Sequence, residues 1–225
     1  VKILLISFPS VPNWEITMIE AELAFRSAQP IDAAVAAALI YSAAPEQYHF
    51  VFAVDRFTII DFLQRAFRNG SRLFGYQRYT VVTVEDQVIA IGAFYGTAAS
   101  PKPDFKTLGT LMNCFDPIRF VGILRRSAQF SALLAHSTPE TKYIANFAVL
   151  EPWRGQGIGT IFLQREIGLA KTQGYKTCAL NVSASNPKAQ QLYERLGFQV
   201  VKETSFSQIA AQVRPPALRR MELAL

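Results

Sequence analysis

The sequence contains few residues of the kinds that form disulfides or bind metals. Among its 225 residues there are two cysteines, Cys114 and Cys178, and they form no C-x-x-C pair. The two histidines, His49 and His136, lie apart from each other and from the cysteines. These spacings exclude the familiar zinc and thiol redox motifs, so we expect no metal site.

Long apolar runs are also missing. The longest, from Ile31 to Ala44, includes polar side chains and is shorter than the ~18 residues that a membrane span needs. The opening residues hold too short an apolar stretch for a convincing signal peptide. We therefore expect a cytoplasmic protein that makes no contact with a membrane.

Apolar residues are abundant, and charge is unevenly distributed. Hydrophobic residues make up 50% of the chain, which is enough for a large core and excludes a mainly disordered chain. The length favours one enlarged domain over residues 1–225. The formal charge is +6, and the last third holds 10 basic against 5 acidic residues. Nucleic acid, a membrane face or a polyphosphate ligand would each suit this excess.

Hydrophobic periodicity predicts the elements of the N-terminal half. A strand is expected within residues 16–24, and helices from Pro30 to Ala44, where Pro45 ends the pattern, and from Thr58 to Asn69. Strands at 79–84 and 88–95 form a hairpin around Glu85 and Asp86. One or two helices are expected from Pro117 to Leu134.

The C-terminal half alternates strands and helices. Strands are predicted at residues 143–149, 177–182, 198–206 and 218–223, and helices at 157–172 and 187–196. An alternating series of this kind is typical of a mixed sheet flanked by helices.

A glycine-rich turn links the first of these strands to the next helix. It reads Glu151-Pro152-Trp153-Arg154-Gly155-Gln156-Gly157-Ile158-Gly159-Thr160. Glycines let the backbone turn sharply and approach a ligand closely, so that N–H groups at the helix start can bind an anion, with Arg154 adding a full charge. Phosphate or pyrophosphate is the natural ligand. A turn that only joins strand to helix is the alternative.

Two other nucleotide motifs do not fit this turn. A dinucleotide fingerprint that starts at Gly155 needs glycine at Thr160 and an acidic residue where Asn181 and Val182 stand. A Walker loop needs Gly-Lys-Ser/Thr, which does not occur in the chain.

A second segment combines a helix start with a tyrosine on an apolar face. Asn186 is a good N-cap residue and Pro187 suits the first helical position. The apolar stripe consists of Ala189, Leu192, Tyr193 and Leu196. This pattern places the Tyr193 hydroxyl on the buried side, where it serves either packing or catalysis.

Together the two segments resemble the GNAT superfamily of acyl-CoA-dependent N-acyltransferases. The resemblance runs from Tyr143 to Lys202 and comprises Arg-x-x-Gly-x-Gly after a strand, a strand ending in Ala-Leu-Asn-Val, and Asn-x-x-Ala-x-x-x-Tyr-x-x-x-Gly-Phe. It implies an α/β (α+β) fold, with a mixed, mostly antiparallel central sheet that splays between the fourth and fifth strands and helices on both faces. It also implies a single N-acetyltransferase domain.

The resemblance assigns roles to individual residues. Pantetheine of acetyl-CoA would lie along the fourth strand, at Phe147, Ala148 and Val149. Asn186 would reach the cofactor from the following helix, and Lys188 would meet the adenosine phosphate. Tyr193 matches the usual general acid. The pyrophosphate would bind the turn formed by Arg154, Gly155, Gln156, Gly157, Ile158, Gly159 and Thr160.

We therefore expect an N-acetyltransferase that transfers acetyl from acetyl-CoA to a primary amine by direct attack, with no metal. A polyanionic cofactor explains the basic C-terminal third without nucleic acid. The alternative is a non-catalytic acyl-CoA-binding regulatory protein. The acceptor stays open among antibiotics, polyamines, amino acids and protein termini.

The sequence does not identify the general base. Tyr143 stands near the position where some family members carry glutamate, and its phenol is a poor base. Glu151 follows the strand on the phosphate side, whereas Glu85 and Asp86 belong to the hairpin turn. Asn146 either contacts the acceptor or is an ordinary buried amide.

Residues 98–141 exceed the short connection that a minimal family member needs. We expect this helical insertion to cover the acceptor cleft, to form a homodimer contact, or to add a core helix. Its notable side chains are Phe105, Phe115, Arg119, Phe120, Arg125, Arg126 and Phe130.

Overall fold

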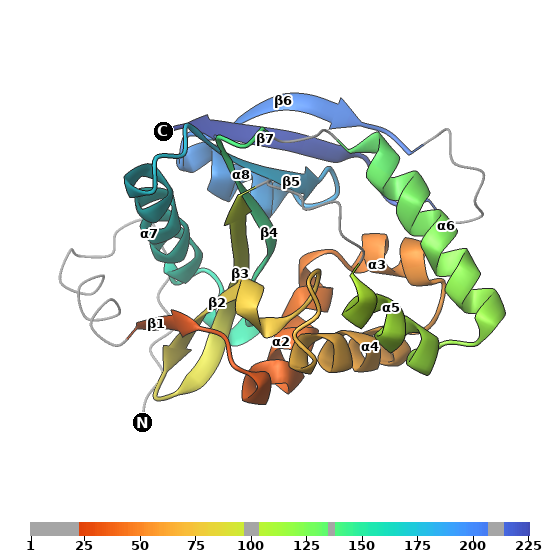
Figure 1. The fold of residues 1–225 in the computed structure, drawn as a ribbon. Helices are drawn as coiled ribbons and strands as arrows, with labels where there is room; N and C mark the ends of the chain where they lie inside the picture. Colours follow the sequence, from red (N-terminus) through yellow and green to blue (C-terminus); the bar gives the residue numbers. More distant parts are fainter. Residues whose placement is uncertain (1–22, 97–103, 135–137, 207–213) are drawn as a thin grey trace.

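The computed structural model describes residues 23–96, 104–134, 138–206 and 214–225, which form a seven-stranded sheet flanked by helices (Figure 1). The strands are β1 (Ala24–Ser27), β2 (Tyr79–Val84), β3 (Gln87–Gly96), β4 (Thr141–Val149), β5 (Thr177–Ser183), β6 (Gln199–Thr204) and β7 (Leu218–Ala224). The α-helices are α2 (Ala33–Ala43), α3 (Pro45–Phe52), α4 (Arg56–Arg68), α5 (Phe105–Cys114), α6 (Pro117–Leu133), α7 (Ile158–Thr172) and α8 (Pro187–Arg195). Short 3-10 turns are η1 (Pro30–Asp32), η2 (Tyr76–Arg78) and η3 (Glu151–Trp153).

The sheet has the order β1-β2-β3-β4-β5-β7-β6, and the pair β4 and β5 is parallel whereas the others are antiparallel. β4 and β5 pair only from Thr141 to Ile144, opposite Thr177 to Leu180. Beyond this point the two strands diverge, as Figure 1 shows. The expected mixed, mostly antiparallel sheet with its splay is thus confirmed.

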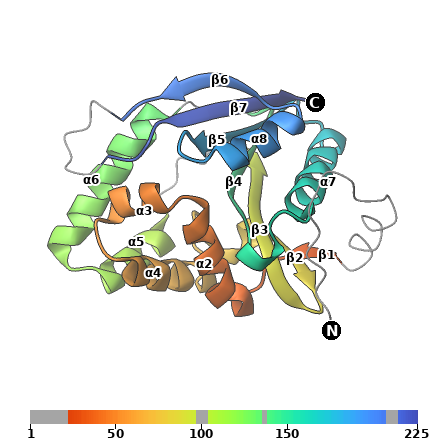
Figure 2. The ribbon, with the colours of Figure 1, turned by 180° about the vertical axis from the view of Figure 1, so that it is seen from behind.

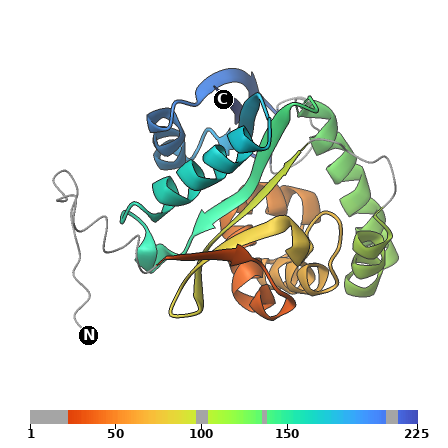
Figure 3. The ribbon, with the colours of Figure 1, turned by 60° about the vertical axis from the view of Figure 1, so that its left-hand side comes forward.

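Helices cover both faces of the sheet. On one face α2 packs against β3 and β4 and α4 packs against α2, and residues such as Ile40, Phe62 and Phe67 are buried in the apolar cluster that these elements form. α7 and α8 pack on the opposite face (Figures 2 and 3), with Leu163 and Tyr193 in a second cluster. The splay between β4 and β5 lies between these two apolar clusters.

Several predicted boundaries are confirmed, and α3 is a helix that was not predicted. The hairpin turns through Glu85 and Asp86, both with positive φ, and residues 117–133 form one helix. The prediction that the Ala-rich helix ends at Pro45 is confirmed, since α2 ends at Ala43, but Pro45 also begins α3, a helix that the sequence analysis missed. Proline suits that position, since the first N–H of a helix needs no acceptor. Most of the predicted strand at 16–24 lies outside the described residues, and β1 begins at Ala24.

Candidate active site

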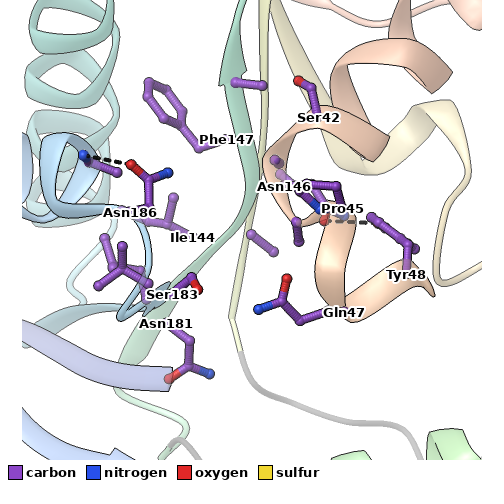
Figure 4. A pocket seen from close by; sticks show the side chains of 18 of the residues that line it. Ser42, Pro45, Gln47, Tyr48, Ile144, Asn146, Phe147, Asn181, Ser183 and Asn186 are labelled. Atoms are coloured by element: carbon purple, nitrogen blue, oxygen red, sulfur yellow. Dashed lines mark hydrogen bonds between the residues drawn. The ribbon is translucent and has the colours of Figure 1, made fainter. Parts of the chain in front are cut away.

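A cavity of about 1210 Å³ follows the splay between β4 and β5 (Figure 4). At one end its wall includes the glycine turn and α8, and at the other it includes α3, α5 and α6. The sequence-predicted residues that line it are Phe147, Ala148, Val149, Arg154, Gly155, Gly157, Gly159, Thr160, Asn186, Lys188 and Tyr193. One cavity therefore brings together most of the residues that the two motifs singled out.

Two predicted residues, Gln156 and Ile158, are not part of the described lining of the cavity. Ile158 is almost fully buried in the core between α7 and the sheet. The Gln156 side chain turns back, and its Nε2 donates a hydrogen bond to the carbonyl oxygen of Pro152 at 2.9 Å.

The glycine turn takes a backbone conformation that favours glycine. Gly155 and Gly157 have φ values of 76° and 82°, and a Cβ atom added to either would meet no atom within 4 Å. The intrahelical ladder of α7 starts where Ile161 N–H donates to the Gly157 carbonyl. The N–H groups of Ile158, Gly159 and Thr160 precede this first bond and so have no acceptor within the helix, as an anion site requires.

Arg154 lies exposed beside this turn and is anchored to β4. Its Nε donates a hydrogen bond to the carbonyl oxygen of Val149 at 2.9 Å. The next N–H, that of Leu150, donates to Ile89 on β3 at 2.8 Å. Because backbone groups alternate along a strand, the groups of Val149 point away from β3, toward the splay.

α8 presents both a cap and the buried tyrosine. Oδ1 of Asn186 accepts a hydrogen bond from the Ala189 N–H at 3.1 Å, so that only its Nδ2 remains to donate (Figure 4). Lys188 is exposed at the rim. Tyr193 is 8% exposed, and burial raises the pKa of its phenol to about 12. Tyr193 therefore keeps its proton throughout the physiological pH range.

Asn146 occupies an irregular position in β4. Ile91 pairs with Ala148 and Ala93 pairs with Ala145, so β4 holds an extra residue over this stretch. Asn146 itself has a left-handed φ of 49°. Its side chain links two buried tyrosines, since Tyr48 donates to Oδ1 at 3.1 Å and Nδ2 donates to the Tyr79 hydroxyl oxygen at 2.9 Å.

None of the bases considered from the sequence places a carboxylate in the described lining of the cavity. Tyr143 does line it, but as a phenol. Burial raises the pKa of Tyr143, whose hydroxyl oxygen accepts a hydrogen bond from Asn181 Nδ2 at 2.8 Å. Glu151 is exposed in η3, and neither it nor the hairpin acids contribute to the described lining. Glu46 at the start of α3 is the one acidic residue in that lining, and Ser185 Oγ donates to its Oε1 at 3.3 Å.

Sequence reasoning missed the α3 wall of the cavity. Gln47 and Tyr48 line it, and both are buried. The available signal was Pro45, whose position after a helical run also fits the first turn of a new helix.

The insertion is helical between Phe105 and Leu133, as α5 and α6. Several of its side chains line the far end of the cavity, namely Thr107, Leu111, Ile123, Ser127, Phe130 and Ser131. The opposite face of these helices exposes apolar side chains, among them Phe105, Met112, Ile118 and Val121. A homodimer contact through this face stays a prediction.

In the described part of the chain, no cluster of three or more histidine, cysteine, aspartate or glutamate residues has an arrangement that would hold a metal ion. None of the described helices combines the length and apolar character needed to cross a membrane.

Residues 40–198 match the model of the acetyltransferase (GNAT) family. The chain belongs to the GNAT acetyltransferase family. The matched region includes the glycine turn, the splayed strands and α8, and it also spans α3, α5 and α6.

Curated relatives of this GNAT acetyltransferase match it over short regions. N-alpha-acetyltransferase 30 of Schizosaccharomyces pombe is 39% identical over 56 residues, which is 25% of this chain and 37% of the relative. The uncharacterized N-acetyltransferase YycN of Bacillus subtilis is 35% identical over 71 residues, 30% of this chain and 46% of the relative. The chain thus spans less than half the length of the curated relatives it matches.

Solved structures share the fold. An N-acetyltransferase from Staphylococcus aureus Mu50 superposes with a TM-score of 0.62 at 19% identity, covering 89% of this chain and 100% of that chain. A ribosomal-protein-alanine N-acetyltransferase from Brucella melitensis gives 0.51 at 16% identity, with 90% and 99% coverage. At these identities the likeness concerns the arrangement of the elements alone.

Proposed function

We propose that this GNAT acetyltransferase transfers the acetyl group of acetyl-CoA to a primary amine by direct attack, with Tyr193 as general acid. The observation that carries the proposal is the continuity of one cavity from the glycine turn, past Tyr193, to the pocket beneath α3 and α6. Acetyl-CoA would supply an activated thioester, and the amine would enter from the opposite end.

The cofactor end of the cavity suits a polyphosphate ligand. Its described lining carries three cationic side chains, Arg154, Lys188 and Arg195. The open space over Gly155 and Gly157 leaves room for phosphate oxygens against the backbone. We infer that Arg154 and the N–H groups at the start of α7 bind pyrophosphate, that Asn186 Nδ2 donates to the cofactor, and that Lys188 meets the adenosine phosphate.

The splay of β4 would align the thioester. Backbone groups of Phe147 and Val149 would bind pantetheine, and strand N–H groups would stabilise negative charge that develops on the carbonyl oxygen. Holding both reactants in one cavity replaces a bimolecular encounter, an effect worth up to about 7–11 kcal/mol when the geometry is well aligned.

Tyr193 would donate its proton to the departing thiolate. Burial keeps its phenol neutral, so a donor is present at every physiological pH. The amine must attack in its neutral form, which at pH 7 costs about 4.6 kcal/mol for a lysine-like amine and about 1.4 kcal/mol for an α-amine. A water molecule would remove the proton from the amine. Glu46 is the acidic group of the described lining that would assist this step.

The test measures free CoA release with a panel of amines, together with the affinity for CoA. We expect Tyr193→Phe to lower kcat by about 10²-fold while the Kd of CoA stays within twofold. Tyr175→Phe is the matched control, because Tyr175 lies outside the described cavity lining. Wild-type activity in Tyr193→Phe would remove its role. Binding of acetyl-CoA without thiol release with any amine would favour the non-catalytic acyl-CoA-binding protein.

A further inference from the structure

Gln47 presents an unsatisfied polar atom at the acceptor end of the cavity. Its side chain lies on α3, is 8% exposed and lines the cavity. Its buried Oε1 has no hydrogen-bond partner among the described residues. Figure 4 shows the amide directed away from α3, toward the side of the cavity where Asn181 and Ser183 lie. Because an unpaired buried acceptor is costly, a ligand that donates a hydrogen bond here would be favoured.

The wall around Gln47 is otherwise largely apolar. Aromatic side chains surround this end from several elements, and Tyr48, Phe52, Phe62, Phe74 and Tyr95 all contribute. The insertion adds Leu111, Ile123 and Phe130 from α5 and α6. This composition suits an aliphatic or aromatic group that leaves water on binding.

Charge argues against a polycationic ligand. In the described lining Glu46 is the one acidic residue, and it already accepts a hydrogen bond from Ser185. The cationic residues of the lining, Arg154, Lys188 and Arg195, come from the glycine turn and α8. Each ammonium group of a polyamine or an aminoglycoside beyond the first would therefore be buried without a carboxylate partner.

We infer that the acceptor is a primary amine with a single apolar, aliphatic or aromatic body, that the insertion helices enclose this body, and that the acceptor donates a hydrogen bond to Oε1 of Gln47. The inference rests on the proposed function and names its acceptor class. Gln47 is thus a specificity-determining residue of the acceptor site. α6 sets the length of the group that the cavity accepts.

The first experiment measures amine binding to the full chain saturated with CoA, by calorimetry. 2-Phenylethylamine is the apolar probe, methylamine the small probe and spermidine the polycationic probe. We expect 2-phenylethylamine to bind at least about tenfold more tightly than either of the others. It alone combines an apolar body that fills this end of the cavity with a single ammonium group. Equal or tighter binding of spermidine, or no binding of 2-phenylethylamine, would overturn the inference.

Two variants test the residues that carry it. Gln47→Leu removes the hydrogen-bond-accepting Oε1 and keeps a similar side-chain volume. It should raise the Kd of 2-phenylethylamine by about 3- to 10-fold, with no loss of thermal stability. The matched control is Gln87→Leu, since Gln87 is exposed on the hairpin. Unchanged affinity in Gln47→Leu contradicts its role.

Ser127→Leu places a larger side chain on the α6 wall of the cavity. It should weaken the binding of 2-phenylethylamine about tenfold, while the binding of methylamine stays the same. Ala128→Leu on the exposed side of α6 is its control. Equal effects of the two variants would show that α6 does not enclose the acceptor.

CoA release separates this inference from the proposed function. If 2-phenylethylamine binds with the expected preference but releases no CoA, the acceptor class stands and the transfer reaction falls. If spermidine releases CoA efficiently and 2-phenylethylamine does not, the transfer reaction stands and the acceptor class falls.

Discussion

The hydroxyl group of Tyr48 on α3 donates a hydrogen bond to Oδ1 of Asn146 on β4, at a distance of 3.1 Å. The Asn146 amide donates in turn to Tyr79, at 2.9 Å. This chain of hydrogen bonds connects α3, which lines the cavity, to the irregular part of β4, directly before Phe147. Helix position and strand conformation are therefore coupled at the middle of the cavity, between the proposed cofactor end and the proposed acceptor end.

Replacing Tyr48 by phenylalanine removes the first of these hydrogen bonds and leaves Oδ1 of Asn146 unpaired. We expect Tyr48→Phe to lower the free energy of unfolding by about 1–2 kcal/mol, measured by urea denaturation. Tyr76→Phe is a suitable control, because Tyr76 is half-buried against Phe67. Equal stability of Tyr48→Phe and the wild type would show that the bond contributes nothing.

Two substitutions at Asn146 separate the effect of its side-chain hydrogen bonds on stability from the effect of its backbone conformation. Asn146→Gly and Asn146→Ala both lose the hydrogen bonds to the tyrosines, but alanine must also adopt the left-handed φ of 49°. We expect Asn146→Ala to be the less stable of the two by about 1 kcal/mol in denaturant unfolding. Equal unfolding free energies would mean that β4 relaxes to an ordinary strand conformation in the variants.

Gly157 and Gly174 provide a matched pair at opposite ends of α7. Both have φ of 82°, and a Cβ atom at either meets no neighbour within 4 Å. Alanine at either position should therefore cost about 1 kcal/mol of unfolding free energy. Only Gly157→Ala should also weaken CoA binding, by about tenfold or more, because its methyl group occupies the anion site. Equal CoA affinity of the two variants would argue against phosphate binding at this turn.

The pH dependence of kcat/KM should show a single ionisation on the acid side. The neutral amine is the reactive form, so the rate rises with pH through the pKa of the acceptor. Tyr193 must be protonated to donate, and its pKa of about 12 predicts no loss of activity from its ionisation below about pH 11. Tyr193→Phe should lower the whole profile without moving its acid limb, as measured with one amine across pH 6–10. A shift of that limb would assign the ionisation to Tyr193.

Glu166 on α7 is a buried carboxylate whose replacement should stabilise the protein at alkaline pH. Burial raises the pKa of Glu166, although the ion pair with Arg165 opposes this effect. Between the ordinary and the raised pKa the folded state binds more protons than the unfolded state, so stability falls as pH rises. We expect Glu166→Gln to have the higher free energy of unfolding at pH 8 and to lose this advantage at pH 4. An advantage that is constant with pH would contradict this reasoning.

The C-terminal half could be predicted closely because its signals are local. Asn186 caps the helix that follows it, and Ala189, Leu192 and Tyr193 lie on one face because of the helical repeat. The positive φ of Gly157 likewise depends on the residue itself, because glycine has no Cβ atom and adopts this conformation easily. The C-terminal half could therefore be predicted from neighbours in the chain.

The arrangement of α3, α5 and α6 depends on contacts between distant residues. Pro45 suits both the end of one helix and the start of another, and α3 forms where its buried side chains pack against α4 and α6. No spacing rule predicts that Tyr48 meets Asn146, 98 positions away, or that β4 carries its extra residue there. α5 lies within the predicted helical insertion, but its bounds were not predicted, and its side chains reach the cavity through the packing of α5 against α4 and α6.

The sequence by itself determined the glycine turn, the capped tyrosine helix and the family that they indicate, because these features depend on backbone conformation and helical periodicity within a few residues. The tertiary structure decided that α3, α5 and α6 form one wall of the cavity and that Gln47 lines it. That placement follows from the burial of apolar faces on α2, α3, α4, α5 and α6, whose contacts join segments separated by tens of residues.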